Sequence, residues 1–448
     1  MEKNLTRGSV FKTIISFSLP FLLSYFLQTL YGMADLFLIG QFNGVDSTTA
    51  VSIGSQVMHM LTVMIVGLAM GSTVMIGKAV GADQREEISA AVGNTVTLFM
   101  GVSAVLTVTL LLMVKPIVSV MSTPTEAVQG TVAYLTICFM GIPFITAYNI
   151  ISSIFRGMGD SKSPMYFVAI ACTANIVLDL LFIGVMGMGP AGAALGTTLS
   201  QTISVAISLW IIMKKQKGLS LRKTDLRPQK NRMAALLKVG LPVAFQDGFI
   251  QIAFIVITVI ANQRGLNDAA AVGIVEKIIG ILFLVPSSML STVSALCAQN
   301  IGAGRHDRAK KTLMFAVLIC VSFGLLSVSV MQLAAEPSVG LFTEDGDVIR
   351  LGSQYMRGYV WDCILAGTHF CFSGYFCAYG LSLISFLHNI ASITLARIPL
   401  AYLASICFPD TLFPMGLATT AGSGLSVIIC IGVFLWLERG KRKDLQHG

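Results

Sequence analysis

Apolar runs long enough to cross a bilayer recur along the whole chain, with short polar segments between them. A helix needs about 20 predominantly apolar residues to span the hydrocarbon core, so this pattern predicts an all-α membrane protein with many spans. We expect twelve transmembrane helices. Their approximate ranges are 13–40, 48–77, 88–114, 128–155, 164–186, 191–213, 234–261, 269–300, 309–333, 349–378, 385–407 and 412–437.

Several motifs of the first half return in the second half at an offset near 221 residues. The repeated pieces are Leu19-Pro20 and Leu241-Pro242, Ala50-Val51 and Ala271-Val272, Gly81-Ala82 and Gly302-Ala303, and Tyr134 and Tyr355. Because each half holds six spans, both halves have the same orientation. This predicts two six-helix bundles related by a pseudo-two-fold axis along the membrane normal, with a central cavity between them. We assign residues 1–213 to an N-terminal lobe, 214–233 to a basic cytoplasmic linker, and 234–448 to a C-terminal lobe with a cytoplasmic tail.

The composition is typical of a membrane protein, since 55% of the residues are hydrophobic and only 12% are charged. A soluble domain is about 25% charged. The first twelve residues are polar and basic, and the apolar run after them lacks an A-x-A-like site, so we predict no cleaved signal peptide. The nine Cys include no C-x-x-C pair, and His59, His369 and His388 lack metal-ligand spacing. We therefore expect neither a disulfide framework nor a transition-metal site.

The basic residues fall in alternate loops. Most of the 30 Lys and Arg lie in the N-terminal segment, in the loops after the second, fourth, sixth and eighth spans, and in the C-terminal tail. The exceptions are Lys115, Arg264, Lys277, Arg350, Arg357 and Arg397. The positive-inside rule places these basic loops and both termini in the cytoplasm. The net charge of +8 therefore reflects membrane topology, and we expect no nucleic-acid partner.

The first predicted helix carries a polar stripe. Gln28, Tyr31 and Asp35 are spaced i, i+3 and i+7, so they share one helical face. Upstream of them, Pro20 removes one backbone hydrogen bond and provides a hinge. We interpret the stripe as a cavity-facing surface that ends in a protonatable group. The alternative is that Asp35 lies at the outer interface in contact with water.

The fifth predicted helix carries a second acid, Asp179, near the middle of its span. Asn175 lies four residues earlier, on the same helical face. A carboxylate at the centre of a membrane helix costs about 3 kcal/mol or more, so it usually faces a cavity and has a function. The alternative is a structural ion pair with an intramembrane cation of the other half, Lys277 or Arg397.

Two carboxyl groups in a low-dielectric site cannot both ionise easily. If Asp35 and Asp179 lie together, their site takes either a proton or a sodium ion. Asn175 and Thr197 would then add oxygen ligands, which hard cations prefer. The sequence leaves the choice between H⁺ and Na⁺ open.

The second half carries three further intramembrane acids, Asp247, Glu276 and Asp362. These acids are candidates for contact with a cationic substrate. The glycine-rich stretch that ends in Gly77-Lys78-Ala79 lacks the Ser or Thr that a Walker A loop needs. The sequence therefore shows no ATPase module, so any pumping must be driven by an ion gradient or a partner.

These residues and motifs resemble the MATE (multidrug and toxic compound extrusion) transporters over nearly the whole chain, from about residue 13 to residue 437. The most specific pieces are the segment from Phe155 to Pro164, and Asn175 to Asp179 followed by Gly192-Ala193-Ala194 and Thr197. Ala34-Asp35 and Gly81-Ala82 agree with the same pattern. The first half is most similar to the DinF-like branch of bacterial transporters. The second half departs from the family pattern at Ala378-Tyr379-Gly380-Leu381.

The resemblance implies a twelve-helix exporter of the bacterial cytoplasmic (inner) membrane, with two six-helix lobes. It implies exchange of cytoplasmic amphipathic organic cations, such as drugs and toxic compounds, for H⁺ or Na⁺ by alternating access. The DinF-like pattern implies a coupling-ion site in the first lobe, formed by Gln28, Asp35, Tyr134, Asn175, Asp179 and Thr197. We expect no cofactor other than the ion gradient, and a monomer that works in the lipid bilayer.

Two other classes of function remain open. A lipid-linked saccharide flippase of the same superfamily is the main alternative. A flippase cavity is expected to carry several cations for the pyrophosphate, whereas here the intramembrane cations are Lys277 and Arg397. An integral-membrane enzyme is the other class, but the sequence shows neither a metal-binding cluster nor a nucleophile constellation, so we expect no enzymatic activity.

Overall fold

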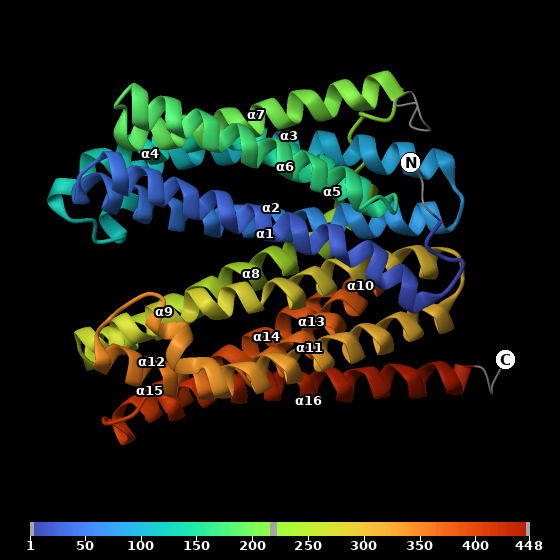
Figure 1. Cartoon of the computed structure of the whole chain (residues 1–448). Coiled ribbons are helices and arrows are strands. Elements are labelled where there is room, and N and C mark those ends of the chain that lie inside the picture. Colours follow the sequence, from blue (N-terminus) through green and yellow to red (C-terminus); the bar gives the residue numbers. More distant parts are fainter. Residues whose placement is uncertain (1–3, 216–221, 445–448) are drawn as a thin grey trace. The chain divides into compact units, whose positions relative to one another are not determined.

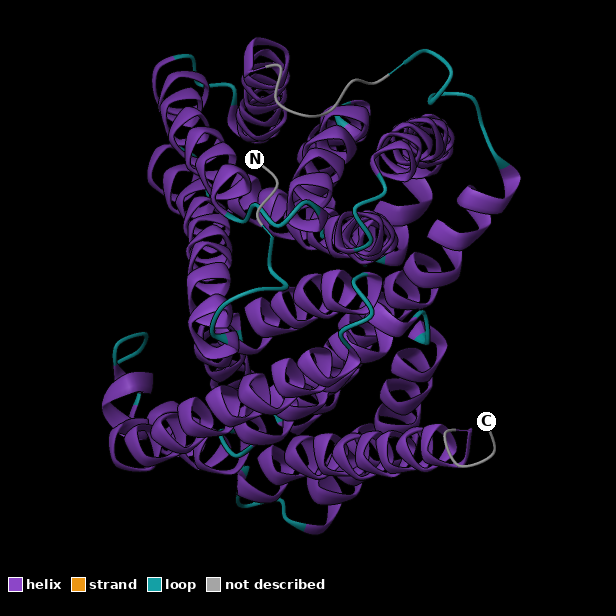
Figure 2. Ribbon diagram, turned by 90° about the vertical axis from the view of Figure 1, so that its right-hand side faces the viewer, coloured by secondary structure: helices purple, strands orange, loops and turns teal. Residues whose placement is uncertain are grey.

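The computed structural model describes residues 4–215 and 222–444, and every regular element in these ranges is a helix (Figure 1; Figure 2). The first half contains α1 (Val10–Phe42), α2 (Val45–Gly81), α3 (Arg85–Val120), α4 (Thr125–Met140), α5 (Ile142–Gly157), α6 (Lys162–Asp179), the π-helical turn η1 (Leu180–Val185) and α7 (Gly189–Lys215). Part of the predicted linker, 214–233, and the end of the predicted tail lie outside the described residues.

The second half has the same helical character. It contains α8 (Lys230–Arg264), α9 (Leu266–Leu282), α10 (Leu284–Gly302), α11 (His306–Gly340), α12 (Gly346–Tyr359), α13 (Asp362–Tyr379), α14 (Ser382–Ser392), the π-helical turn η2 (Ile393–Arg397), α15 (Ile398–Cys407) and α16 (Phe413–Asp444). Several predicted spans are therefore built from two consecutive helices.

Among the described residues, ten helices or continuous helix groups are long and apolar enough to span a membrane, and eleven if α4 and α5 form one bent span. The bend between α4 and α5 is 51° and lies at Gly141. Pro143 lies two residues further on and has no N–H group for a helical hydrogen bond. The tenth predicted span, 349–378, corresponds to α12 and α13. α12 carries Asp347, Arg350 and Arg357, so it is amphipathic and not uniformly apolar.

The helices pack as two compact units. Unit 1 contains Met1–Ala244 and Ala298–His306, and unit 2 contains Phe245–Cys297 and Asp307–Gly448. The first turns of α8 and the last turns of α10 thus pack with the first half, although the sequence assigns all of 234–448 to the second lobe.

Two repeated glycines explain why the end of α10 packs within unit 1. A methyl group at Gly81, the last residue of α2, would overlap the backbone carbonyl of Gln299. A methyl group at Gly302, the last residue of α10, would overlap the backbone carbonyl of Lys78. Because glycine has no Cβ, the two helix ends approach to backbone contact. The repeated Gly-Ala motif of the sequence is therefore a reciprocal packing contact.

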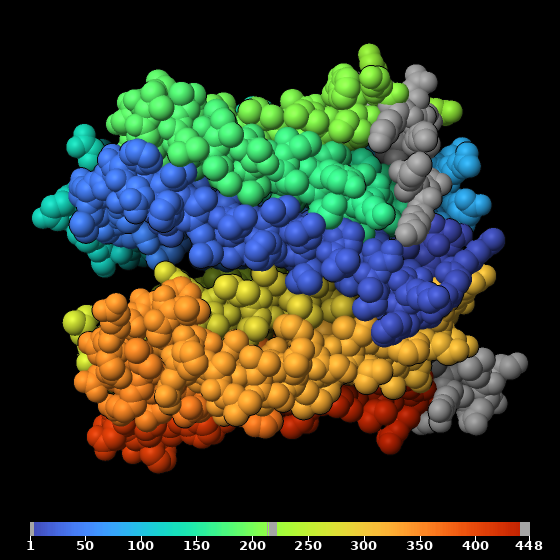
Figure 3. Space-filling model, in the orientation of Figure 1, coloured from blue at the N-terminus to red at the C-terminus, as the bar shows by residue number. Residues whose placement is uncertain are grey.

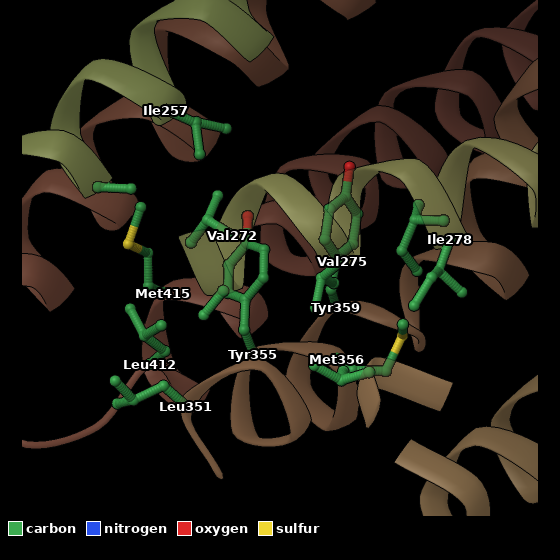
Figure 4. Packing of buried hydrophobic residues seen from close by; sticks show 14 of the residues in the cluster. Ile257, Val272, Val275, Ile278, Leu351, Tyr355, Met356, Tyr359, Leu412 and Met415 are labelled. Atoms are coloured by element: carbon green, nitrogen blue, oxygen red, sulfur yellow. The ribbon is translucent and has the colours of Figure 1, made fainter. Parts of the chain in front are cut away.

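The hydrophobic core of unit 2 lies where α8, α9 and α12 meet the start of α16 (Figure 4). Val272 and Val275 of α9 are spaced i, i+3 and contribute one apolar face to this cluster. Tyr355 and Tyr359 of α12 belong to the same cluster, and their ring centroids are 5.5 Å apart. In unit 1, a corresponding cluster joins residues of α1, α2, α4 and α7 around Tyr134. These cores fix the helices that carry the polar residues.

α1 lies along the surface of unit 1 (Figure 3, blue). Its side chains Leu19, Phe26 and Phe37 are exposed, and we interpret them as facing lipid. Asp35 lies on the same helix but is buried. α1 continues through Pro20, which is also buried, and the hinge at Pro20 stays a prediction.

Candidate functional site

Three helices of unit 1, α1, α6 and α7, pack against one another and bring most of the predicted polar residues together. The last two turns of α6 carry Asn175 and Asp179, after which the chain continues as the π-helical turn η1. π-helical turns are rare and often lie at functional sites. At the turn into α7, Gly189 has a φ of 56°, a conformation that favours glycine.

Gly196 allows α7 to approach the acid of α6. A methyl group at Gly196 would overlap the Oδ1 atom of Asp179, so the absence of a side chain leaves room for this carboxyl group. Asp179 is 0% exposed and Asn175 is 1% exposed. The Nδ2 atom of Asn175 donates a hydrogen bond of 3.3 Å to Asp179 Oδ2. The sequence-predicted pair on α6 is thus enclosed by α7.

Asp35 reaches the same place from α1. The hydroxyl group of Thr197, on α7, donates a hydrogen bond of 3.2 Å to Asp35 Oδ2. The carboxyl groups of Asp35 and Asp179 lie within hydrogen-bonding reach of each other, and Asn175 is also within reach of Asp35. Asp35 is only 5% exposed, which contradicts the alternative that it lies at the outer interface in contact with water.

Three oxygen atoms of this group have no hydrogen-bond donor among the described residues: Asp35 Oδ1, Asn175 Oδ1 and Asp179 Oδ1. A buried acceptor without a donor is costly, and a buried unpaired charge is more costly still. A proton shared by the two carboxyl groups, or a hard cation bound by the oxygen atoms, would remove this cost. The donor set therefore fits H⁺ or Na⁺.

A small pocket lies next to Asn175, beside the carboxyl pair. It is lined by Gln28, Tyr31, Tyr148, Val168, Ala171, Asn175, Ser200 and Gln201. Asn175 lines the pocket and also donates to Asp179, so it connects the two places. The hydroxyl group of Tyr148 lies near Gln28. Two residues of the polar stripe predicted on α1, Gln28 and Tyr31, therefore face this pocket.

Tyr134 approaches the site from α4. It is buried in the apolar cluster of unit 1, and a methyl group at Gly54 of α2 would overlap its ring. Its hydroxyl group lies near Cys138, within electrostatic range of Asp35 and Tyr31. Tyr134 thus belongs to the surroundings of the carboxyl pair, while Thr197 and Asn175 make the direct hydrogen bonds.

Asp179 and Arg397 each have a hydrogen-bond partner within their own half. In unit 1, the hydrogen-bond partner of Asp179 is Asn175. In unit 2, Nη2 of Arg397 donates a hydrogen bond of 2.9 Å to the hydroxyl group of Tyr359. Lys277 is exposed on α9. The structural ion-pair alternative for Asp179 is therefore not needed to explain its burial.

Unit 2 contains a buried charged cluster around Arg397, which the sequence identified only in part. Arg397 lies in η2, with its guanidinium 4.8 Å from the centroid of the Phe254 ring. Glu276 and Asp362 both interact electrostatically with Arg397. The hydroxyl group of Thr258 donates a 3.4 Å hydrogen bond to Glu276 Oε2. One oxygen of each acid, Glu276 Oε1 and Asp362 Oδ1, has no donor among the described residues, so both acids stay candidates for substrate contact.

The remaining predicted residues of unit 2 lie elsewhere on its helices. Asp247 is partly buried on α8. His388 lies between two serine hydroxyl groups, 3.0 Å from Ser373 Oγ and 3.1 Å from Ser426 Oγ, and its ring centroid is 5.6 Å from that of His369. Within residues 4–215 and 222–444, no three His, Cys, Asp or Glu side chains are placed to hold a metal ion.

Sequence reasoning did not identify Ser200, Gln201 and Tyr148 as pocket residues. Ser200 and Gln201 follow Thr197 by three and four residues on α7, so the helical period places them on the same face. That signal was available in the sequence. Tyr148 lies on α5 and reaches the pocket only through helix packing.

Comparison with known proteins gives a family match on both halves of the chain. A protein-family model described as MatE matches residues 20–181 and 242–403. The two matched ranges have equal length and begin at residues 20 and 242, which confirms the internal repeat found in the sequence.

The chain is 26% identical over 444 residues to the probable multidrug resistance protein YoeA of Bacillus subtilis, covering 97% of this chain and 96% of that protein. It is 27% identical over 442 residues to the probable multidrug resistance protein YpnP of the same organism, covering 98% of each chain. Among solved structures, it is similar to a MATE protein crystallised in complex with MaL6, with a TM-score of 0.90, 23% identity and 99% of each chain covered. This likeness confirms the predicted all-α fold of twelve helices in two bundles.

Proposed function

The chain belongs to the MatE family of multi-pass membrane transporters, and we propose that it is a secondary active exporter that exchanges cytoplasmic organic cations for H⁺ or Na⁺. The observation that carries this proposal is the buried pair of Asp35 and Asp179, whose Oδ1 atoms have no donor among the described residues. Such a pair can hold one positive charge and release it. Both Bacillus relatives are named probable multidrug resistance proteins, which supports drugs as the class of substrate.

Occupancy of the site gives a means of moving α1. When the site is empty, the two carboxylates repel each other; when it is filled, that repulsion is cancelled and Thr197 and Asn175 can close around the ion. Pro20 leaves one backbone acceptor of α1 without its helical donor, so the helix can bend there. An ion shifts such an equilibrium by the difference between its affinities for the two arrangements. Alternating access follows if the two arrangements open the transport cavity to opposite sides.

For the substrate, we propose contact with acids of the second half, Asp247, Glu276 or Asp362. Carboxylate oxygens without a donor in Glu276 and Asp362 would accept hydrogen bonds from an organic cation. The flippase alternative is not favoured, because two acids, Glu276 and Asp362, interact electrostatically with the buried cation Arg397. We expect the protein to act as a monomer without an organic cofactor.

Transport by purified protein in lipid vesicles tests this function. A fluorescent organic cation would be supplied while a proton gradient or a sodium gradient is imposed separately. We expect the cation to accumulate against its own gradient with one of the two ions, and to equilibrate when both gradients are collapsed. The same transport rate with and without gradients would contradict secondary active transport. Movement of a lipid-linked saccharide in place of the cation would support the flippase.

The orientation of the chain is also a proposal, based on the basic loops that we assign to the cytoplasm. Cys407, the exposed cysteine at the end of α15, is then extracellular, and the linker residue Lys223 is cytoplasmic. In intact cells, a membrane-impermeant maleimide should label Cys407. It should not label a Lys223→Cys, Cys407→Ser variant until the cells are permeabilised. The reverse result would invert the predicted topology.

A further inference from the structure

Residues 222–230 of the linker are bound to the side of α3. Asn94, on α3, is 0% exposed, and both ends of its amide contact the linker. Its Nδ2 atom lies 3.4 Å from the Asp225 carbonyl oxygen, to which it donates, and its Oδ1 atom accepts a 2.8 Å hydrogen bond from the backbone N–H of Gln229. A buried side-chain amide that is satisfied in this way holds the linker in one position.

Three further contacts fix the same segment. The hydroxyl group of Thr97 donates a 2.7 Å hydrogen bond to the Leu226 carbonyl oxygen. A methyl group at Gly93 would overlap the carbonyl oxygen of Asp225, so the linker backbone lies directly on α3. Just beyond the segment, Arg232 forms an ion pair of 2.6 Å with Glu87. The linker is therefore docked at several points along α3.

The docked segment presents a run of basic side chains. Arg222, Lys223, Arg227 and Lys230 are exposed, and none of them forms an ion pair within the described part of the chain. The acid within the run, Asp225, accepts a 2.8 Å hydrogen bond from the backbone N–H of Arg222. The nearby acid Glu87 is already paired with a cation of α8. Four positive charges thus remain without a counter-charge from the described residues.

The segment lies next to the ends of two predicted spans. It follows α7, whose membrane-spanning part ends at Ile212, and it precedes α8. Near the end of α7, Nζ of Lys214 lies 4.8 Å from the centroid of the Trp210 ring. Tryptophan and lysine of this kind mark the membrane–water interface. The side chain of Leu226, within the basic run, is 42% exposed and is available to insert among lipid chains.

We propose that this docked linker is a binding site for the phosphate headgroups of anionic phospholipids. Arginine side chains match phosphate oxygens with paired N–H donors, and lysine adds a point charge. Each basic residue held near an anionic membrane surface gives about a five-fold gain in affinity. Docking on α3 keeps the four cations together, and Leu226 favours a lipid over a soluble anion. The site is separate from the carboxyl pair, and its test needs no transport measurement.

Fluorescence quenching beside the linker measures this lipid preference. The three native Trp would be replaced by Phe, and Leu226→Trp would provide a single reporter within the basic run. The protein would be placed in phosphatidylcholine vesicles that contain either brominated phosphatidylglycerol or brominated phosphatidylcholine. We expect the brominated anionic lipid to quench with an affinity about five-fold higher or more, and this preference to fall as salt is added.

The second experiment removes four positive charges from the linker and compares the result with the removal of four positive charges from other segments. We expect the preference for the anionic lipid to disappear when four side chains of the linker are changed to Gln. These side chains are Arg222, Lys223, Arg227 and Lys230. The matched control changes four exposed cations of other segments that we predict to be cytoplasmic: Lys12, Arg85, Lys162 and Lys311. The control should keep the preference. Equal loss in both four-fold variants would overturn the proposal, because net charge alone would then explain it.

The docking contacts are tested without any change of charge. Asn94→Ala with Thr97→Ala removes side-chain hydrogen bonds to the linker and should lower the lipid preference. An unchanged preference would contradict the role of docking. The last experiment adds inorganic phosphate to the buffer and compares it with sodium chloride at the same ionic strength. If phosphate abolishes the lipid preference and sodium chloride does not, the site binds free phosphate and the lipid assignment is wrong. Thermal unfolding of each variant shows that the fold is retained.

Discussion

Asp179→Asn is expected to abolish ion-coupled export while the protein still inserts and folds. The substitution keeps the shape of the side chain, and the new amide can accept the hydrogen bond from Asn175 and donate one to Asp35. A buried amide costs less free energy than a buried carboxylate, so stability should stay equal or rise. The group that takes up H⁺ or Na⁺ charge is lost. Coupling free energies of about 1–3 kcal/mol correspond to about 5–150-fold effects, and we expect gradient-driven export to fall by roughly 100-fold.

The measurement is gradient-driven export in vesicles, together with the melting temperature of the variant. Asp247→Asn is the matched control, because it makes the same chemical change to a partly buried acid of unit 2. We expect this control to keep the ion dependence of transport. If Asp179→Asn exports at the normal rate with the normal ion dependence, the first-half site is wrong. Loss of ion dependence in Asp247→Asn alone would move the coupling site to the second half.

The double variant Asp35→Asn, Asp179→Asn should lose little more export than either single variant. The two carboxyl groups lie within hydrogen-bonding reach, and Asn175 is within reach of both. If they share one proton or one Na⁺, removal of either group destroys the same site. Residues that act as one unit give non-additive effects in a double-mutant cycle. We therefore expect each single variant to lose about 100-fold and the double variant to stay within about three-fold of the weaker one.

This cycle is scored by ion-dependent export of the same organic cation, with all variants at equal protein content in the vesicles. Thr197→Ala serves as an intermediate case, since it removes the 3.2 Å hydrogen bond to Asp35 but leaves both acids. It should reduce export less than either Asp variant. If each single variant loses only part of the ion-dependent export, and the fold-reduction in the double variant equals the product of the two, the acids form two independent ion sites. The shared-site model would then be abandoned.

Helical spacing and the free-energy cost of burying a carboxylate predicted part of the candidate site. Asn175 and Asp179 are four residues apart, and Gln28, Tyr31 and Asp35 follow one face of α1, so their common directions could be read from the chain. The high cost of a carboxylate in an apolar helix predicted that both acids would be enclosed, and both are buried. The partner of each acid could not be read in this way. Thr197 donates to Asp35 and not to the nearer acid in sequence, because the packing of α1, α6 and α7 against one another decides which side chains meet.

By itself, the sequence determined the properties that depend on composition and on short periods: an all-α membrane fold, twelve spans, an internal repeat and the identity of the buried acids. Tertiary structure alone decided which of these residues touch. Three contacts join residues that are 17 to 135 positions apart. They are the close approach of Gly196 to Asp179, the hydrogen bond of Arg397 to Tyr359, and the hydrogen bond of Asn94 to Gln229 of the linker. Such contacts depend on how whole helices pack, and packing follows from the combined shape of many side chains, which no local pattern specifies.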